Sequence, residues 1–252
     1  MSELAAPPTR RNEAWRYADF TALEALAPSD FARRRELAVA PGETHSECFV
    51  LDETSPGLHR LRLILGAGAR AEIFAVLSAA AYTRLDVEVV LEEGAHFELG
   101  GVTIGGGDAT REIVTRLAHA RPGATSNQAV RSVHWGRATG NFLGAIEVAR
   151  DAQKTDAAQN FRAILLEAGA SANAKPELEI FADDVKCAHG AAIGTLDKAA
   201  AFYMASRGIP PDAARRLLIR AFIADAFVAV RSEEDRDAML GKAVDVLEGF
   251  AG

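Results

Sequence analysis

Cysteine and aromatic residues are scarce in this sequence, and long apolar runs are missing. The chain has two cysteines, Cys48 and Cys187, and aromatic residues make up 7% of its 252 residues. Two thiols so far apart predict neither a disulfide framework nor a CxxC metal motif, so we expect both to stay reduced in the cytoplasm. No run of about 18 apolar residues occurs, and we therefore expect no membrane-spanning helix.

An excess of positive charge is also lacking, because the formal net charge is -7 at pH 7. A nucleic-acid-binding protein needs a basic stripe to neutralise phosphates, so we expect no nucleic-acid partner. The one basic run, residues 33–35, is more typical of a solvated face. The N-terminal segment MSELAAPPTRRNEAW places charges and prolines where a secretory signal has its apolar core, which again favours a cytoplasmic protein.

Three zones differ in residue pattern. Residues 1–45 are rich in charge, alanine and proline, and predict an N-terminal helical segment with one short helix over 12–26, capped by Asn12. Residues 46–196 alternate between apolar and polar side chains, which predicts short strands. Residues 197–252 have helical periodicity and predict a small C-terminal helical domain.

A glycine–alanine pair punctuates the strand zone at intervals of 21 to 29 residues. The pairs are Gly68-Ala69, Gly94-Ala95, Gly123-Ala124, Gly144-Ala145, Gly169-Ala170 and Gly190-Ala191. Glycine suits tight corners, and alanine fits the crowded space behind them. A period in the low-to-mid twenties favours stacked β-coils over an antiparallel sandwich, whose turns usually come about every 8 to 12 residues.

Three helices are expected in the last zone. Asp197 can cap a helix over 198–206, and Gly208 can end it. A second helix opens at Pro211, and a third, capped by Ser232, runs over 233–250. The second helix has apolar residues at three- and four-residue steps, namely Ala214, Leu217, Leu218, Ala221, Phe222 and Ala224. Strands followed by helices exclude an alternating α/β fold.

One motif could bind a metal. Cys187 and His189 stand at i and i+2, so they share a face if the segment is a strand. A thiol and an imidazole can hold a soft or borderline metal, but two ligands do not complete a site. A buried structural thiol beside a histidine is the alternative. Asp183 and Asp184 are adjacent and would point to opposite faces of a strand, so they do not form a catalytic pair.

Three segments together resemble the SufB/SufD family of iron–sulfur cluster assembly proteins. They are EAWRYADFTAL (13–23), the run from Pro176 to Pro210 containing DDVKCAHG, and ARRLLIRAFIADAF (214–227). The form DDVKC-x-HG is similar to the SufD branch of that family. Lys154, Gln159 and Asn160 also match a family stretch, whereas residues between 23 and 154 resemble it only in texture.

The resemblance implies a right-handed parallel β-helix with a C-terminal helical domain. It further implies a scaffold complex with a SufB-like subunit, which pairs through the β-helices, and a SufC-like ATPase, which docks on the helical domain. In this chain the implied docking residues are Asp197, Phe202, Tyr203, Arg207, Gly208, Leu217, Leu218 and Phe222. The chain is shorter than many family members, mostly in its N-terminal region.

The resemblance also implies that Cys187 and His189 help to hold a transient iron–sulfur cluster shared with SufB, with His189 the stronger candidate ligand. The chain is then not an enzyme. Two alternatives are a purely structural subunit that binds no metal and a β-helical polysaccharide-active enzyme, which would need a secretion signal and an aromatic groove. The sequence leaves open whether flavin associates with the complex and whether the chain forms a homodimer.

Overall fold

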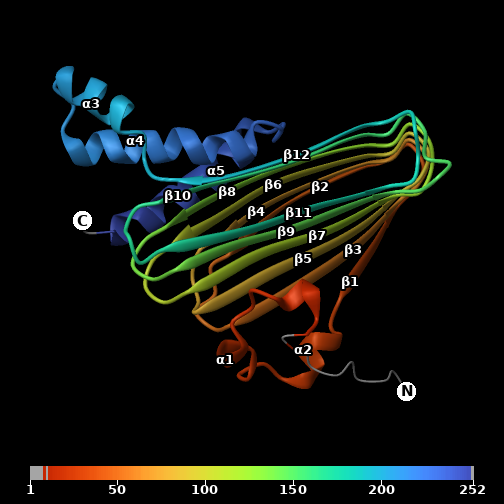
Figure 1. The fold of residues 1–252 in the computed structure, drawn as a ribbon, viewed down its shortest axis with the longest axis horizontal. Helices are drawn as coiled ribbons and strands as arrows, with labels where there is room; N and C mark the ends of the chain where they lie inside the picture. The colour runs from red at the N-terminus through yellow and green to blue at the C-terminus, as the bar shows by residue number, and fades with distance from the viewer. Residues whose placement is uncertain (1–7, 10, 251–252) are drawn as a thin grey trace.

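Two parallel β-sheets form the body of the protein (Figure 1). The computed structural model describes residues 8, 9 and 11–250. Residues 1–7, 10, 251 and 252, which belong to the predicted 1–45 and 197–252 zones, lie outside the described residues. The strands in the described residues are β1 (Arg35–Val39), β2 (Thr44–Leu51), β3 (Gly57–Leu65), β4 (Arg70–Leu77), β5 (Tyr82–Leu91), β6 (His96–Gly105), β7 (Thr110–His119), β8 (Thr125–His134), β9 (Thr139–Val148), β10 (Asp156–Leu165), β11 (Ser171–Ile180) and β12 (Lys186–Gly194).

The chain alternates between the two sheets, so each coil contributes one strand to each. The odd sheet has the order β1-β3-β5-β7-β9-β11, and the even sheet has the order β12-β10-β8-β6-β4-β2. Every adjacent pair is parallel and in register. This stacking of about six coils confirms the predicted parallel β-helix, and the antiparallel sandwich is excluded.

The coils are longer than the sequence period indicated. Arg35 pairs with Leu61, an offset of 26 residues. Thr139 pairs with Ser171, an offset of 32 residues. The shorter predicted period was wrong because the pairs that begin at Gly144 and Gly190 lie inside β9 and β12, where they mark no corner.

Other glycine–alanine pairs do mark corners. Gly68, Gly94 and Gly123 have φ values of 65°, 64° and 70°, and the alanine after each is fully buried. The N–H of Gly68 donates to the carbonyl of Glu93 in the next coil at 2.7 Å, and equivalent bonds follow along this corner. Lys154 occupies the next equivalent place with φ 64°, so one corner repeats a left-handed turn that glycine adopts without strain.

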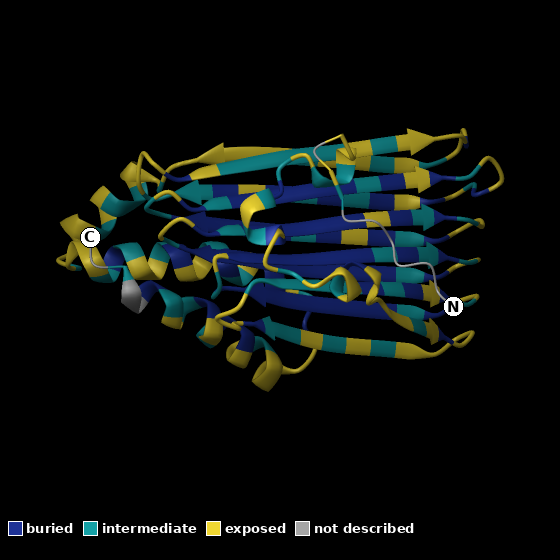
Figure 2. Cartoon of the chain, turned by 90° about the horizontal axis from the view of Figure 1, so that it is seen from below, coloured by how far each residue is buried: buried dark blue, intermediate teal, exposed yellow. Residues whose placement is uncertain are grey.

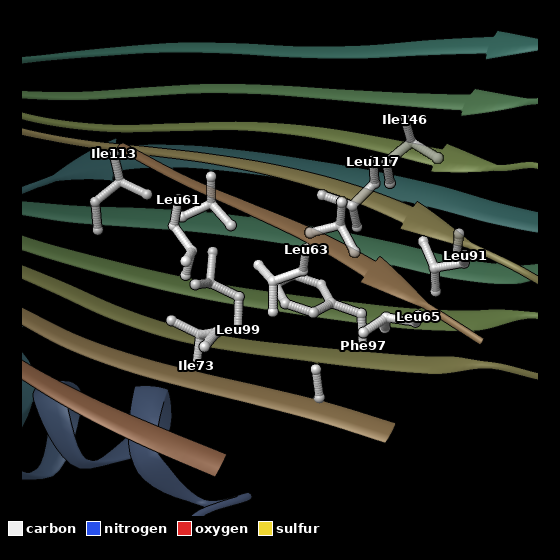
Figure 3. Packing of buried hydrophobic residues seen from close by; sticks show 14 of the residues in the cluster. Leu61, Leu63, Leu65, Ile73, Leu91, Phe97, Leu99, Ile113, Leu117 and Ile146 are labelled. Carbon is white, nitrogen blue, oxygen red and sulfur yellow. The ribbon is translucent and has the colours of Figure 1, made fainter. Parts of the chain in front are cut away.

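The core lies between the sheets, where inward side chains from opposite strands interdigitate (Figure 3). Leu63 and Leu65 from the odd sheet are fully buried, as are Phe97 and Leu99 from the even sheet. Burying each such side chain contributes about 1.5–3 kcal/mol. The alternation of side chains along each strand therefore produces a continuous apolar column through the middle coils.

The C-terminal helices lie beside the even sheet, and all but the first of them cover its outer face (Figure 1). They are α3 (Lys198–Ser206), α4 (Pro211–Ala224), η2 (Asp225–Phe227), α5 (Glu233–Asp245) and η3 (Val246–Gly249). The outward side chains of Phe74 and Val102 pack against Ile223 and Phe227. The predicted caps Asp197 and Ser232 both accept hydrogen bonds from backbone N–H groups of their helices.

The N-terminal segment differs from its prediction. A single helix over 12–26 is wrong, because η1 (Glu13–Trp15) and α1 (Phe20–Leu23) are separate turns. The Asn12 side chain caps neither turn, and Asp19 caps α1 by accepting from two backbone N–H groups. Asp19 can do so because it immediately precedes the helical turn that needs acceptors.

This segment packs on the outer face of the odd sheet. The Arg84 guanidinium carbon lies 3.8 Å from the ring centroid of Trp15, which is a cation–π contact. After α2 (Pro28–Ala32), the first strand begins at Arg35, so the β-body starts inside the segment predicted as 1–45. Within the described residues, no helix has the length and apolarity needed to span a membrane.

Candidate functional site: the last coil

The last coil, β11 and β12, ends the stack with an uncovered edge. Among the described residues, β12 pairs only with β10, and β11 pairs only with β9. Both strands are half-buried or exposed, whereas the strands in the middle of the stack are mostly buried (Figure 2). Their outer backbone N–H and C=O groups are therefore available to a further strand.

Cys187 and His189 lie on β12, as the spacing predicted, and they share its inward face. Cys187 pairs with Ala157, and His189 pairs with Gln159. Ala157 and Gln159 are buried between the sheets, so the side chains of Cys187 and His189 also face the interior of the solenoid. Because no coil covers β12 in the described structure, His189 stays exposed, and Cys187 is half-buried.

The Cys187 thiol is not activated in the isolated chain. Burial raises its pKa, and the negative charge of Asp156 raises it further. A metal binds the thiolate, so binding at Cys187 must displace a firmly held proton. In the described part of the chain, no group of three or more His, Cys, Asp and Glu side chains could hold a metal ion. A cluster held here as cargo would need ligands from another molecule.

The other polar residues near the motif have structural roles. The Lys154 ammonium pairs with the Asp184 carboxylate, and the Asp184 N–H donates to the Gln153 side chain at 2.9 Å. These contacts fix the turn that leads into β12. Asp183 and Asp184 thus lie in a corner, and the strand placement from which they were expected to point to opposite faces was wrong.

The row formed by two buried amides and His189 was not predicted from the sequence, although Gln159 itself lies in a stretch that resembles the family. Gln128, Gln159 and His189 pair in register across β8, β10 and β12, in one inward row. Within the described residues, both side-chain polar atoms of Gln128 and the Oε1 atom of Gln159 have no hydrogen-bond partner. The Gln159 amide N–H group donates to the Glu177 carbonyl at 3.2 Å. The sequence carries no signal for this row, since the coils that align it differ in length.

The uncovered end also carries apolar side chains. Phe181 is 51% exposed and Ile193 is 48% exposed, and both belong to the last coil or its turn. The inward residues of the coil include no Asp, Glu, Lys or Arg; they are Ala172, Ala174, Pro176, Leu178, Ile180, Cys187, His189, Ala191 and Ile193. An uncharged, partly apolar end with free strand edges is a surface for strand addition.

The predicted partner residues lie on α3, on α4 and in the segments that flank α3. Phe202 is 77% exposed, Tyr203 and Leu217 are also exposed, and α3 buries none of its side chains. Arg207 stacks over the Tyr203 ring at 5.2 Å, and Gly208 ends α3 with φ 78°. Figure 1 shows α3 projecting from the body of the molecule. This apolar surface is thus unpartnered in the described structure.

The buried face of α4 differs from the predicted stripe. Its buried residues are Ala214, Ile219 and Ile223, whereas Leu217 and Ala221 point to solvent. Ala214 of the predicted stripe is buried and Ala224 is half-buried, whereas Ile219 and Ile223, which the stripe did not include, complete the face toward the sheet. Leu218 and Phe222 are half-buried, and Phe222 packs on the core that the helices share with the even sheet.

Two ion pairs attach the helical region to the even sheet. The buried Arg131 guanidinium binds Asp225, with Nε 2.9 Å from Oδ2, and also donates to the Asn160 carbonyl at 3.2 Å. The buried Glu72 carboxylate lies 3.0 Å from Arg231. Residues 195–197 alone separate β12 from α3. The exposed helical surface is therefore close in sequence to the strand of Cys187 and His189.

Comparison with known proteins relates this architecture to one family. A family model described as "SUF system FeS cluster assembly, SufBD core domain" matches residues 44–222. The "Iron-sulfur cluster assembly protein SufD" of Escherichia coli is 36% identical over 137 residues, which cover 54% of this chain and 32% of that protein.

Two further relatives agree. "Protein ABCI7, chloroplastic" of Arabidopsis thaliana is 46% identical over 96 residues, covering 38% of this chain and 20% of the relative. The "Iron-sulfur cluster assembly protein SufD" of Bacillus subtilis is 31% identical over 132 residues, which cover 52% of this chain and 30% of that protein. The chain thus spans about a third or less of the length of these relatives. Since the family model covers more than half of the chain, this protein belongs to the SufBD family and is of the SufD type.

Proposed function

We propose that this chain is a non-catalytic scaffold subunit in iron–sulfur cluster assembly by the SUF system. The observation that carries the proposal is the uncovered last coil, where Cys187 and His189 share the inward face. Family membership and the SufD relatives support the pathway. Because the described residues provide only these two donors, a partner completes the cluster site.

The partner of the last coil is a SufB-like subunit that adds its strands to β11 and β12. Strand addition satisfies the free backbone groups and covers Phe181 and Ile193. His189 then lies at the interface and contributes an imidazole ligand to a transient cluster. Imidazole exchanges more readily than a full set of thiolates, which suits a cluster that must leave. A homodimer through the same edges is the alternative pairing.

A SufC-like ATPase docks on the exposed apolar surface of α3 and α4, around Phe202, Tyr203 and Leu217. This surface connects to β12 through residues 195–197. ATP-driven movement of the helices then opens or closes the site at the last coil. Neither the cytoplasmic location nor flavin association is needed for this mechanism; the cytoplasmic location stays a prediction, and flavin association stays open.

A second candidate function is that of a structural subunit which joins the complex without binding metal. The raised pKa of Cys187 favours this candidate, because a protonated thiol is a poor ligand. The polysaccharide-active enzyme is less well supported, since Asp184 is engaged in a turn and the family match is to cluster assembly proteins.

Co-expression with SufB-like and SufC-like proteins from the same genome tests these proposals. We expect all three proteins to purify together and to assemble a cluster from iron and sulfide, measured by absorption and iron content. His189→Ala should reduce cluster content severalfold while the complex stays intact. His59→Ala, far from the last coil on β3, is the matched control.

Full cluster content in the His189→Ala complex would favour the structural subunit over the ligand role. Loss of co-purification for the unaltered chain would reject the scaffold itself. A Phe202→Ser and Leu217→Ser variant separates the two interfaces, since it should lose the ATPase and retain the SufB-like subunit.

A further inference from the structure

The first coil, β1 and β2, has charged or titratable side chains at some inward positions where the next coil has core residues, while its other inward residues are apolar, namely Leu37, Val39, Phe49 and Leu51. Arg35 pairs in register with Leu61, His45 pairs with Ala71, and Glu47 pairs with Ile73. All three partners are buried members of the central core. Arg35, His45 and Glu47 therefore occupy inward positions at the outer end of the stack.

These three side chains bind one another across the end of the solenoid. The Arg35 guanidinium donates to Glu47 at 2.5 Å, which joins β1 to β2. The other Glu47 oxygen lies 3.2 Å from Nε2 of His45. Burial would raise the pKa of Glu47, but hydrogen bonds from Arg35 and His45 outweigh it and hold that pKa below its usual value. The carboxylate is thus held charged beside the arginine.

The two ends of the solenoid differ in the cost of adding another coil. A strand stacked on β1 or β2 would bury the Arg35–Glu47 pair, and removing two charged groups from water is unfavourable. A strand stacked on β12 would bury alanines, Ile193 and a histidine, which carry no such penalty. Inward-pointing charges on edge strands are a known protection against unwanted pairing.

We propose that Arg35, His45 and Glu47 form a charged cap that prevents a second copy of this chain from stacking on the first coil. The chain then accepts a partner at the last coil only, so the assembly closes as a pair. Without the cap, head-to-tail stacking of last coil on first coil is heterologous and would propagate into fibres. The inference rests on the proposed function in one respect, namely that the last coil receives a partner.

The test removes the cap without changing net charge. Arg35→Leu with Glu47→Val extends the inward apolar rows of Leu61 and Ile73, so we expect the chain to stay folded. Sedimentation velocity should show at least a twofold rise in weight-average mass over the unaltered chain, growing with concentration, and electron microscopy should show fibres. Arg35→Thr with Glu47→Thr repeats the test with small neutral residues.

Arg62→Leu with Glu88→Val is the matched control. Arg62 and Glu88 form an ion pair with 3.3 Å between Nε and Oε1 on the outer face of the odd sheet. The control exposes the same new apolar groups on the outer face of the sheet and not toward the end of the stack, and it should sediment as the unaltered chain does. If the control associates to the same extent, or if both cap variants sediment as the unaltered chain does, the inference is overturned.

Failure of this inference and failure of the proposed function give different results. Two uncapped first coils can also pair with each other, so association of the cap variants does not require the last coil. Capture of a SufB-like partner by the same variants reports separately on the last coil. Variants that capture the partner but do not self-associate reject the cap and retain the scaffold. Variants that self-associate but capture no partner retain the cap and reject the proposed pairing.

Discussion

At the scale of single residues, two buried histidines are the least expected feature of this solenoid. The sequence analysis singled out Cys187 and His189, and it gave no role to His119 and His134. Nδ1 of His134 lies 3.1 Å from the Gly105 carbonyl, and Nε2 lies 3.2 Å from the Thr103 hydroxyl. Because the carbonyl can only accept, Nδ1 carries the proton in the neutral ring.

These histidines predict a loss of stability in mild acid. Burial, with a smaller effect of Arg111, lowers the pKa of His134 to about 3. Burial likewise lowers the pKa of His119 to about 4. Between about pH 6.5 and those values the unfolded chain binds protons that the folded chain excludes. The free energy of unfolding should therefore fall by about 1 kcal/mol per pH unit and per histidine as the pH drops, and be fully retained above about pH 7.

Urea midpoints measured from pH 7.5 to pH 5 check this expectation. His119→Gln and His134→Gln should each flatten the dependence, whereas His59→Gln, at a half-buried position on β3, should leave it unchanged. Identical slopes in all four proteins would show that the two buried rings are not the cause.

At the scale of secondary-structure elements, close backbone contact holds the helical region against the even sheet. A Cβ atom on Gly100 of β6 would lie 2.0 Å from the Ala226 carbonyl oxygen in η2 and 2.7 Å from the Phe74 ring. Glycine at this position is therefore what lets η2 approach the sheet. Neither hydrophobic periodicity nor helix capping could have revealed this contact, since it joins segments far apart in the chain.

Gly100→Ala should push the helical region away from the sheet. Because the clash is with backbone, the expected loss is about 2 kcal/mol or more of unfolding free energy, measured by urea denaturation. Gly241→Ala on α5 is the matched control, as a Cβ there meets nothing within 4 Å. That control should be neutral or stabilise by about 0.5–1 kcal/mol. Equal stability of the two variants would contradict the close-contact explanation.

The Arg131–Asp225 pair should contribute measurably to the same docking. Asp225→Ala leaves the buried guanidinium of Arg131 with only the carbonyls of Val130 and Asn160 as acceptors. We expect a loss of about 1–3 kcal/mol in unfolding free energy. Faster hydrogen exchange in α4 and η2 should accompany it. Asp237→Ala, at an exposed position of α5, is the control. It should change the unfolding free energy by no more than about 0.5 kcal/mol and leave hydrogen exchange in α4 and η2 unchanged.

At the scale of the whole molecule, the solenoid has two unlike ends. The first coil presents an Arg35–Glu47 ion pair, and the last coil presents uncharged inward residues with free strand edges. A repeat protein of stacked coils generally needs its terminal units to differ from the inner ones. This asymmetry and the exposed α3 are the features on which the two proposed binding surfaces rest.

A charge placed on the last coil should therefore abolish pairing there. Ala191 stands on the inward face of β12, in register with buried Phe161. Ala191→Lys should reduce binding of the SufB-like subunit at least tenfold by isothermal titration calorimetry, because the added strand would bury an unpaired ammonium. Ala192→Lys, one residue on and facing outward, is the control and should bind nearly normally. Equal binding by both variants would place the interface elsewhere.

Local chemistry made part of this structure readable from the sequence. The order of strands then helices, the caps Asp197 and Ser232, and the shared face of Cys187 and His189 all depend on residues close together in the chain. Alternation with period two and acceptors placed before a helix act over a few residues. The prediction of a β-helix followed from them and from the family resemblance, and the structure confirms it.

Other features were decided only by the tertiary structure. The coil offset grows from 26 to 32 residues, so no fixed period aligns Gln128, Gln159 and His189 or brings Arg35 to Glu47. Contact with the sheet likewise buries Ile219 and Ile223 on α4, which the predicted stripe did not include. The physical reason is the same in each case. Stacking of coils and docking of helices are long-range packing choices, and they set which side chains become core, interface or cap.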